Sequence, residues 1–179
     1  MKKSTTLALT AIAFAASAAT SAFAAEPIIG LITKTESNPF FVKMKEGAEA
    51  EAKKLGAKLL SAAGKQDGDT AGQISAMENM VAAGAKTILI TSSGDAIVPT
   101  IKKIKAQGVQ VIALDSPVPE ADALFATNNY KAGELIGAYA KAVLGGKKPV
   151  IATMDLFPGH PVGAQRHNGF LAGYGLKTL

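Results

Sequence analysis

Short apolar segments alternate with longer amphipathic ones along most of this chain. Largely apolar runs occupy residues 28–33, 58–62, 87–90 and 109–114, and each of the first three leads into a segment of helical length. A short apolar run without polar alternation is typical of a strand that helices cover on both faces. The order strand, helix, strand predicts βαβ crossovers and therefore an α/β fold with a parallel, doubly wound sheet.

The first strand and helix are predicted within residues 28–56. After the apolar run, the segment Asn38-Pro39-Phe40-Phe41 leads into a helical pattern. Pro39 fits the first helical turn, where no amide partner is lost, and Gly56 is expected to end the helix. Apolar residues recur at three- and four-residue spacing, which predicts an apolar face made of Phe40, Met44, Ala48, Ala52 and Leu55.

The same alternation continues toward the C-terminus. The second helix is expected to direct Ile74, Met77 and Val81 toward the core. The third helix is expected to do the same with Val98, Ile101 and Ile104. A short strand is predicted at 124–127, then a helix at 130–144, a strand at 149–154 and a helix at 162–173.

Polar side chains follow several of the predicted strands: Asn38, Asp95, Asp115 and Asn128. The carboxyl ends of parallel strands meet at one edge of a sheet, where open α/β folds bind ligands. Asp115 could accept charge-assisted hydrogen bonds from two ligand hydroxyls. The alternative is that it caps the turn at Ser116-Pro117.

Two aromatic rings stand beside the first of these polar residues. Asn38 offers hydrogen bonds, and Phe40 and Phe41 offer apolar surface, which together are what a sugar requires with its hydroxyls and C–H faces. Alternatively, Phe40 and Phe41 belong to the core and Asn38 caps the helix.

Several motifs occur in the order found in one protein family. They are Asn38-Pro39-Phe40-Phe41, Gly84-Ala85-Lys86-Thr87-Ile88-Leu89-Ile90, Val111-Ile112-Ala113-Leu114-Asp115, Phe125-Ala126-Thr127-Asn128-Asn129 and Arg166-His167-Asn168-Gly169-Phe170. Together they resemble the periplasmic sugar-binding proteins of ABC transporters, in the ribose and fructose branch, which have the type I periplasmic binding fold.

The resemblance implies a binding protein without a cofactor, not an enzyme. A monosaccharide would bind between two lobes, and closure of the lobes would present the protein to the membrane permease of an ABC transporter. The ligand-binding residues that it implies are Asn38, Phe40, Phe41, Asp115, Asn128 and Arg166, with Arg166 contributed by the opposite lobe.

Two positions depart from the family pattern. Ser116 stands where the ribose-binding members have Arg, and Asn128 stands where many members have Asp. One strong hydroxyl donor is therefore absent at position 116. For this reason a fructose-like hexose or ketose is preferred to ribose.

The resemblance also suggests a domain division. Residues 26–127 would form the first sugar-binding lobe, and residues 128–179 the opening part of the second. Because the family is roughly twice the size of this chain, the resemblance predicts that the chain is truncated within the second lobe.

The N-terminal residues 1–25 predict a secretory signal peptide. Lys2 and Lys3 begin a basic region, residues 7–19 are apolar, and Ala22-Phe23-Ala24 is a small-residue cleavage signal. The expected location is the periplasm. Cleavage would lower the formal net charge from +5 to +3, and there is no basic cluster with interleaved aromatics, so nucleic acid is not expected as a partner.

Other functions find less support in the sequence. Without cysteine there can be no disulfide or thiolate metal site, and His160 and His167 have no third ligand nearby, so no metal is expected. The phosphate-loop, zinc-helix and nucleophile-elbow motifs are absent from the sequence. The alternatives are a periplasmic protein that presents its ligand to a chemoreceptor or sensor kinase, the effector domain of a transcription regulator, and an α/β enzyme acting on a sugar.

Overall fold

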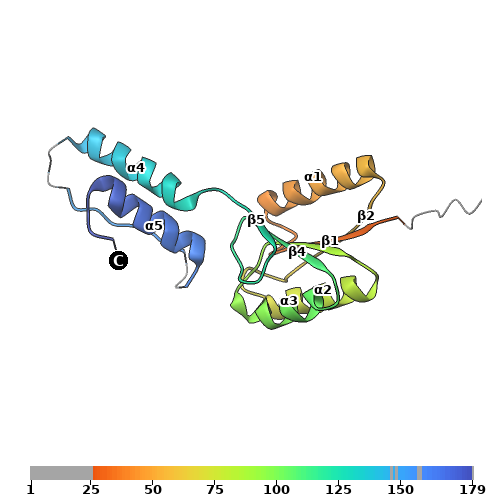
Figure 1. The fold of residues 1–179 in the computed structure, drawn as a ribbon. Helices are drawn as coiled ribbons and strands as arrows, with labels where there is room; N and C mark the ends of the chain where they lie inside the picture. The colour runs from red at the N-terminus through yellow and green to blue at the C-terminus, as the bar shows by residue number, and fades with distance from the viewer. Residues whose placement is uncertain (1–25, 146, 148, 157–158, 179) are drawn as a thin grey trace, which may run out of the picture.

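The described strands form one parallel sheet (Figure 1). The computed structural model describes residues 26–145, 147, 149–156 and 159–178. Within them the strand order is β2-β1-β3-β4-β5, and every neighbouring pair is parallel. The strands are β1 (Ile28–Thr33), β2 (Lys58–Ala63), β3 (Thr87–Ile90), β4 (Gln110–Leu114) and β5 (Ala123–Phe125).

Helices cover both faces of this sheet, which confirms the predicted α/β, doubly wound fold. Helix α1 (Pro39–Leu55) lies on one face, and α2 (Thr70–Ala82) and α3 (Val98–Lys105) lie on the other (Figure 1). A short 3₁₀ turn, η1 (Asp95–Ile97), precedes α3.

The main core lies between the sheet and the layer formed by α2 and α3. Met77 and Ile101 pack against Ile88, Ile90 and other fully buried residues there. The predicted apolar face of α1 is only partly correct. Ala52 is buried, but Phe40 is 53% and Leu55 67% exposed. Phe41 takes the core position instead, because a step of one residue turns a side chain by about 100° around the helix.

The ends of α1 are built as the sequence indicates. Asn38 is the N-cap, and its side-chain oxygen accepts a hydrogen bond from the Phe40 amide. Gly56 adopts φ +66° at the C-terminus, a left-handed conformation that glycine takes without steric cost.

Helices α4 (Asn129–Leu144) and α5 (Pro161–Tyr174) pack side by side, away from the sheet (Figure 1). Four glycines allow this close packing. A Cβ atom at Gly133 or Gly137 would meet the backbone of α5, and one at Gly169 or Gly173 would meet the backbone of α4. The order of these contacts along both helices shows that they run in the same direction.

The strand predicted at 149–154 is wrong, because these residues have no regular secondary structure. A strand needs a neighbour to pair its amide and carbonyl groups. Within the part of the chain that the structure describes, all strands belong to the first sheet, and Val150 and Met154 are fully exposed.

The predicted leader at residues 1–25 lies outside the described residues. None of the described helices is long and apolar enough to cross a membrane. The division into lobes at residues 127 and 128 stays a prediction.

Candidate ligand-binding cleft

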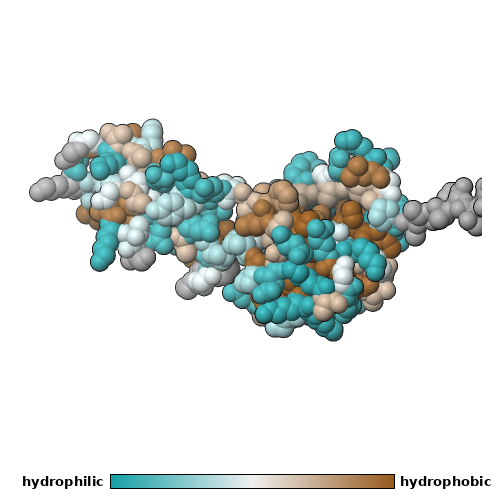
Figure 2. Space-filling model, viewed as in Figure 1, coloured by the Kyte–Doolittle hydropathy of each residue, from teal (hydrophilic) through white to brown (hydrophobic). Residues whose placement is uncertain are grey.

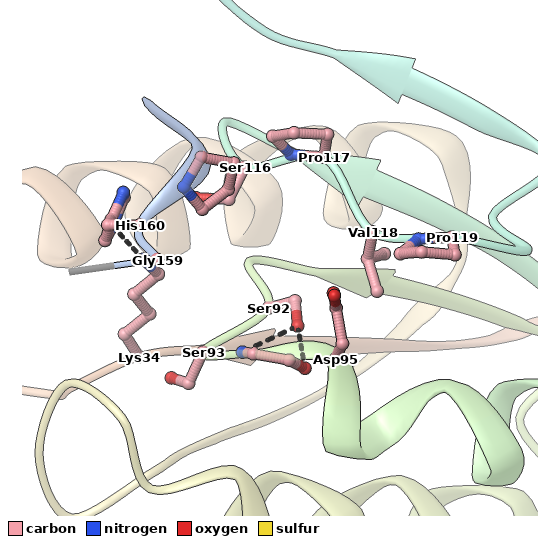
Figure 3. Close-up of a pocket in the computed structure, with 12 residues that line it drawn as sticks. Lys34, Ser92, Ser93, Asp95, Ser116, Pro117, Val118, Pro119, Gly159 and His160 are labelled. Carbon is pink, nitrogen blue, oxygen red and sulfur yellow. Dashed lines mark hydrogen bonds between the residues drawn. The ribbon is translucent and has the colours of Figure 1, made fainter. Parts of the chain in front are cut away.

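A cavity of about 550 Å³ lies at the carboxyl edge of the sheet (Figure 3). Three of its walls are the segments that follow β1, β3 and β4, and the fourth is the segment that precedes α5. The lining residues are Lys34, Ser92, Ser93, Gly94, Asp95, Ser116, Pro117, Val118, Pro119, Gly159, His160 and Pro161. The cavity wall therefore combines residues at the edge of the sheet with residues 159–161, which lie much later in the sequence.

A buried glutamine holds one of the loops that line this cavity. Gln73 on α2 is fully buried, and its Nε2 donates to the carbonyl oxygens of Thr33 at 3.0 Å and Thr91 at 2.8 Å. Its Oε1 accepts a hydrogen bond from the Ser93 amide at 2.8 Å. Gln73 thus connects the ends of β1 and β3 with the loop that lines the cavity.

The loop after β3 is further shaped by its own serine. Ser92 Oγ accepts from the Gly94 amide at 3.1 Å and donates to the Gly94 carbonyl at 3.0 Å (Figure 3). This turn presents Asp95, an exposed carboxylate, at the cavity wall. Of the four polar residues expected at the carboxyl edge, Asp95 is the one that lines the cavity.

A buried lysine and a histidine meet across the cavity (Figure 3). Lys34 is only 4% exposed, and its Nζ lies 3.2 Å from His160 Nε2 and 3.6 Å from Asp67 Oδ1. Burial, and after it the charge of Lys34, lowers the pKa of His160 below its usual value near 6.5. The neutral imidazole is therefore favoured.

The three residues expected at the first strand lie at the start of α1 and do not line this cavity. Asn38 is exposed and caps the helix, which is the alternative to a ligand-binding role that the sequence offered. Phe41 is buried, whereas Phe40 is half-exposed and meets the Phe41 ring edge-on, with the ring centroids 5.3 Å apart.

Asp115 sits immediately beside the cavity. Its backbone has φ +61°, a left-handed conformation, and its amide donates to the Phe125 carbonyl at 2.8 Å. Ser116, which follows it, is buried and lines the cavity. The Ser116 hydroxyl donates a long hydrogen bond to the Asp115 carboxylate at 3.4 Å.

Asn128 and Arg166 lie where the sheet leads into α4. Asn128 caps α4 by accepting a hydrogen bond from the Lys131 amide at 2.9 Å. Arg166 on α5 donates from Nε to Asn129 Oδ1 at 2.9 Å, and the buried Asn129 in turn donates to the Thr127 carbonyl. Arg166 thus ties α5 to the first turn of α4.

Sequence reasoning missed Lys34, Ser92, Ser93, Gln73 and Asn129. For Gln73 a signal was available, because it stands four residues before the inward-facing Met77 and so shares its helix face. His160 was considered only as a metal ligand. Among the described residues, no group of three or more His, Asp or Glu side chains could hold a metal ion.

Comparison with known proteins identifies the family. Residues 29–177 match the profile of the periplasmic binding protein domain. The chain belongs to this family. It is 32% identical over 145 residues to the ribose import binding protein RbsB of Bacillus subtilis, an alignment that covers 79% of this chain and 47% of the relative. The D-allose-binding periplasmic protein of Escherichia coli is 30% identical over 161 residues, which cover 84% of this chain and 51% of that protein.

Solved structures of transporter solute-binding proteins share the fold of this periplasmic binding protein. One from Actinobacillus succinogenes with bound D-allose has a TM-score of 0.75 at 27% identity, covering 84% of this chain and 55% of its own. One from Agrobacterium radiobacter in complex with D-arabinose has a TM-score of 0.73 at 27% identity, covering 87% and 55%. The chain spans about half the length of the curated relatives it matches.

Proposed function

We propose that this chain recognises a monosaccharide as part of the substrate-binding component of an ABC importer in the periplasm. The observation that carries the proposal is the cavity at the carboxyl edge of the sheet, which residues 159–161 close from the side of α5. Its position agrees with the place where open α/β sheets bind ligands. The family membership and the sugars bound by related structures support the same function.

The cavity has the mixed chemistry that a sugar requires. Lys34 and the Ser93 hydroxyl can donate hydrogen bonds, Asp95 can accept them, and Pro117 and Val118 supply apolar surface. Lys34 and Ser116 line the same cavity. The Lys34 ammonium group can therefore supply the hydroxyl donor that is absent at position 116. A fructose-like hexose or ketose remains our preferred ligand, with Asp115 at the margin of the site.

Binding would act through lobe closure and not through catalysis. A sugar that contacts both the sheet edge and the segment before α5 stabilises the arrangement in which the two are close. That arrangement would be the one recognised by the membrane permease. The chain is proposed to bind and deliver its ligand unchanged.

A titration with sugars tests the proposal. The chain is titrated with fructose, ribose, glucose, galactose, allose and arabinose, and amide chemical shifts are followed by NMR, which detects weak as well as tight binding. We expect at least one sugar to shift the amides of Ser93, Asp95 and Ser116. Saturable shifts at these positions would support the proposal, and their absence with every sugar would refute it.

Substitution of Asp115 refines this test. Asn tolerates the left-handed backbone at this position as Asp does, so Asp115→Asn removes the charge without straining the turn. We expect binding to weaken by about tenfold or more, because a charged acceptor is lost. Glu51→Gln on the exposed side of α1 is the matched control and should bind like the unmodified chain. If Asp115→Asn and Glu51→Gln bind sugar with equal affinity, Asp115 is not part of the binding site.

A further inference from the structure

We infer that His160 is a positioning residue for the proposed sugar site: its imidazole holds the ammonium group of Lys34 at the cavity, where that group donates to the ligand. The inference rests on the proposed function. It adds to the site a residue from the segment before α5, which lies 126 positions from Lys34 in the sequence.

The hydrogen bond between Lys34 and His160 can run in only one direction. Lys34 Nζ carries three N–H donors and no acceptor, so at 3.2 Å His160 Nε2 must be the acceptor. The imidazole is then neutral and carries its proton on Nδ1. Because Lys34 is only 4% exposed, its ammonium group depends on such partners in place of water.

The Lys34 ammonium group keeps one N–H for the ligand. One N–H of Lys34 is directed to His160, and Asp67 lies on another side at 3.6 Å. A third N–H is left for a ligand oxygen in the cavity that Lys34 and His160 both line. The side chain of Asp67 is 50% exposed, so without His160 the flexible lysine would turn toward this carboxylate and the solvent.

The charged groups around His160 are Lys34, Asp67, Asp115 and Arg166. Burial and Lys34 lower the pKa of His160, and Arg166 acts in the same direction, whereas the two carboxylates raise it. A protonated imidazole could not accept from Lys34 and would place a second positive charge beside it. The positioning effect should therefore disappear in acid.

The pairing can be measured without any sugar. NMR titration of the imidazole resonances should place the midpoint of His160 below about 6.5 and show the proton on Nδ1. Lys34→Met should raise this midpoint, whereas Lys103→Met on the far surface should not. His167, the second histidine of the chain, pairs with Asp155 at 2.8 Å and serves as an internal control. An unchanged His160 midpoint in Lys34→Met would overturn the inference.

The positioning role is measured as sugar affinity at about pH 7.5 and at about one pH unit below the His160 midpoint that the imidazole titration gives. We expect the unmodified chain to bind about tenfold more weakly at the lower pH. His160→Gln keeps an acceptor that does not titrate, so it should bind well at both values. His160→Leu should bind weakly at both.

The outcomes separate this inference from the proposed function. If the unmodified chain binds sugar equally at both pH values, or if His160→Leu binds as well as the unmodified chain, the positioning role is refuted while the sugar site stands. If the unmodified chain binds no sugar, the proposed function fails. The positioning role of His160 then fails together with the proposed function, even if the imidazole titration shows that Lys34 and His160 interact.

Discussion

At the scale of single residues, the cleft depends on polar side chains that are buried by distant parts of the chain. A lysine directly after a strand would ordinarily be expected at the surface. Lys34 is buried because the segment before α5 returns to cover it, and no local pattern indicates that return. Asp115 and Asn38 were predicted as site residues because their position after a strand is itself a local signal.

Gln73 gives a prediction at this scale. Gln73→Ala would leave the Thr33 and Thr91 carbonyls and the Ser93 amide without the partner that they now share. We expect the free energy of unfolding to fall by about 2–4 kcal/mol, as is usual for buried polar groups that lose their partners. Urea denaturation measures the loss. The exposed Gln107→Ala is the control, and a change as small as that of the control would show that Gln73 does not support the cleft.

At the scale of elements, the sequence predicted the first sheet well and the later segment less well. The predicted bounds of β1 and β3 agree with the structure, and those of α4 and α5 differ by one residue at one or both ends. Hydrophobic spacing and glycine ends are local signals, which explains this success. The strand expected at 149–154 is wrong because pairing depends on a neighbour, which the apolar pattern alone does not reveal.

The contact between α4 and α5 gives the prediction at this scale. Gly137→Ala places a Cβ against the Phe170 carbonyl and the Tyr174 amide, so the two helices must move apart. We expect a loss of about 1–3 kcal/mol in their stability, seen as faster hydrogen exchange of α4 and α5 amides.

Gly47→Ala in α1 is the matched control for this substitution. A Cβ at Gly47 meets nothing within 4 Å, so this change should stabilise α1 by about 0.5–1 kcal/mol through helix propensity. If Gly137→Ala also increased protection, close backbone packing would not be what joins the helices.

At the scale of the whole molecule, apolar side chains of the described residues remain exposed in several places, including two where such residues are neighbours on a strand or a helix. Leu124 and Phe125 are exposed on β5, at the edge of the sheet, and Figure 2 shows hydrophobic surface between α1 and the layer of α2 and α3. The second place is α4, where Leu135, Ile136, Tyr139 and Val143 are each more than half exposed. Spacing predicted α4 as a helix, but the sequence does not show which of its faces is covered.

The exposed face of α4 gives the last prediction. Leu135, Tyr139 and Val143 follow one another at four-residue spacing and so form one continuous apolar stripe. Apolar patches of this kind on soluble proteins are usually covered by other protein, because water contact with them is unfavourable. We therefore expect the chain to self-associate as its concentration rises, which sedimentation velocity would show as a concentration-dependent increase in mass. The double variant Leu135→Lys and Tyr139→Lys should shift the equilibrium toward monomer, whereas Leu55→Lys, at an exposed leucine on α1, should leave it unchanged. A chain that is monomeric at every concentration, or whose association is equally sensitive to Leu55→Lys, would show that the α4 stripe is not the surface that drives association.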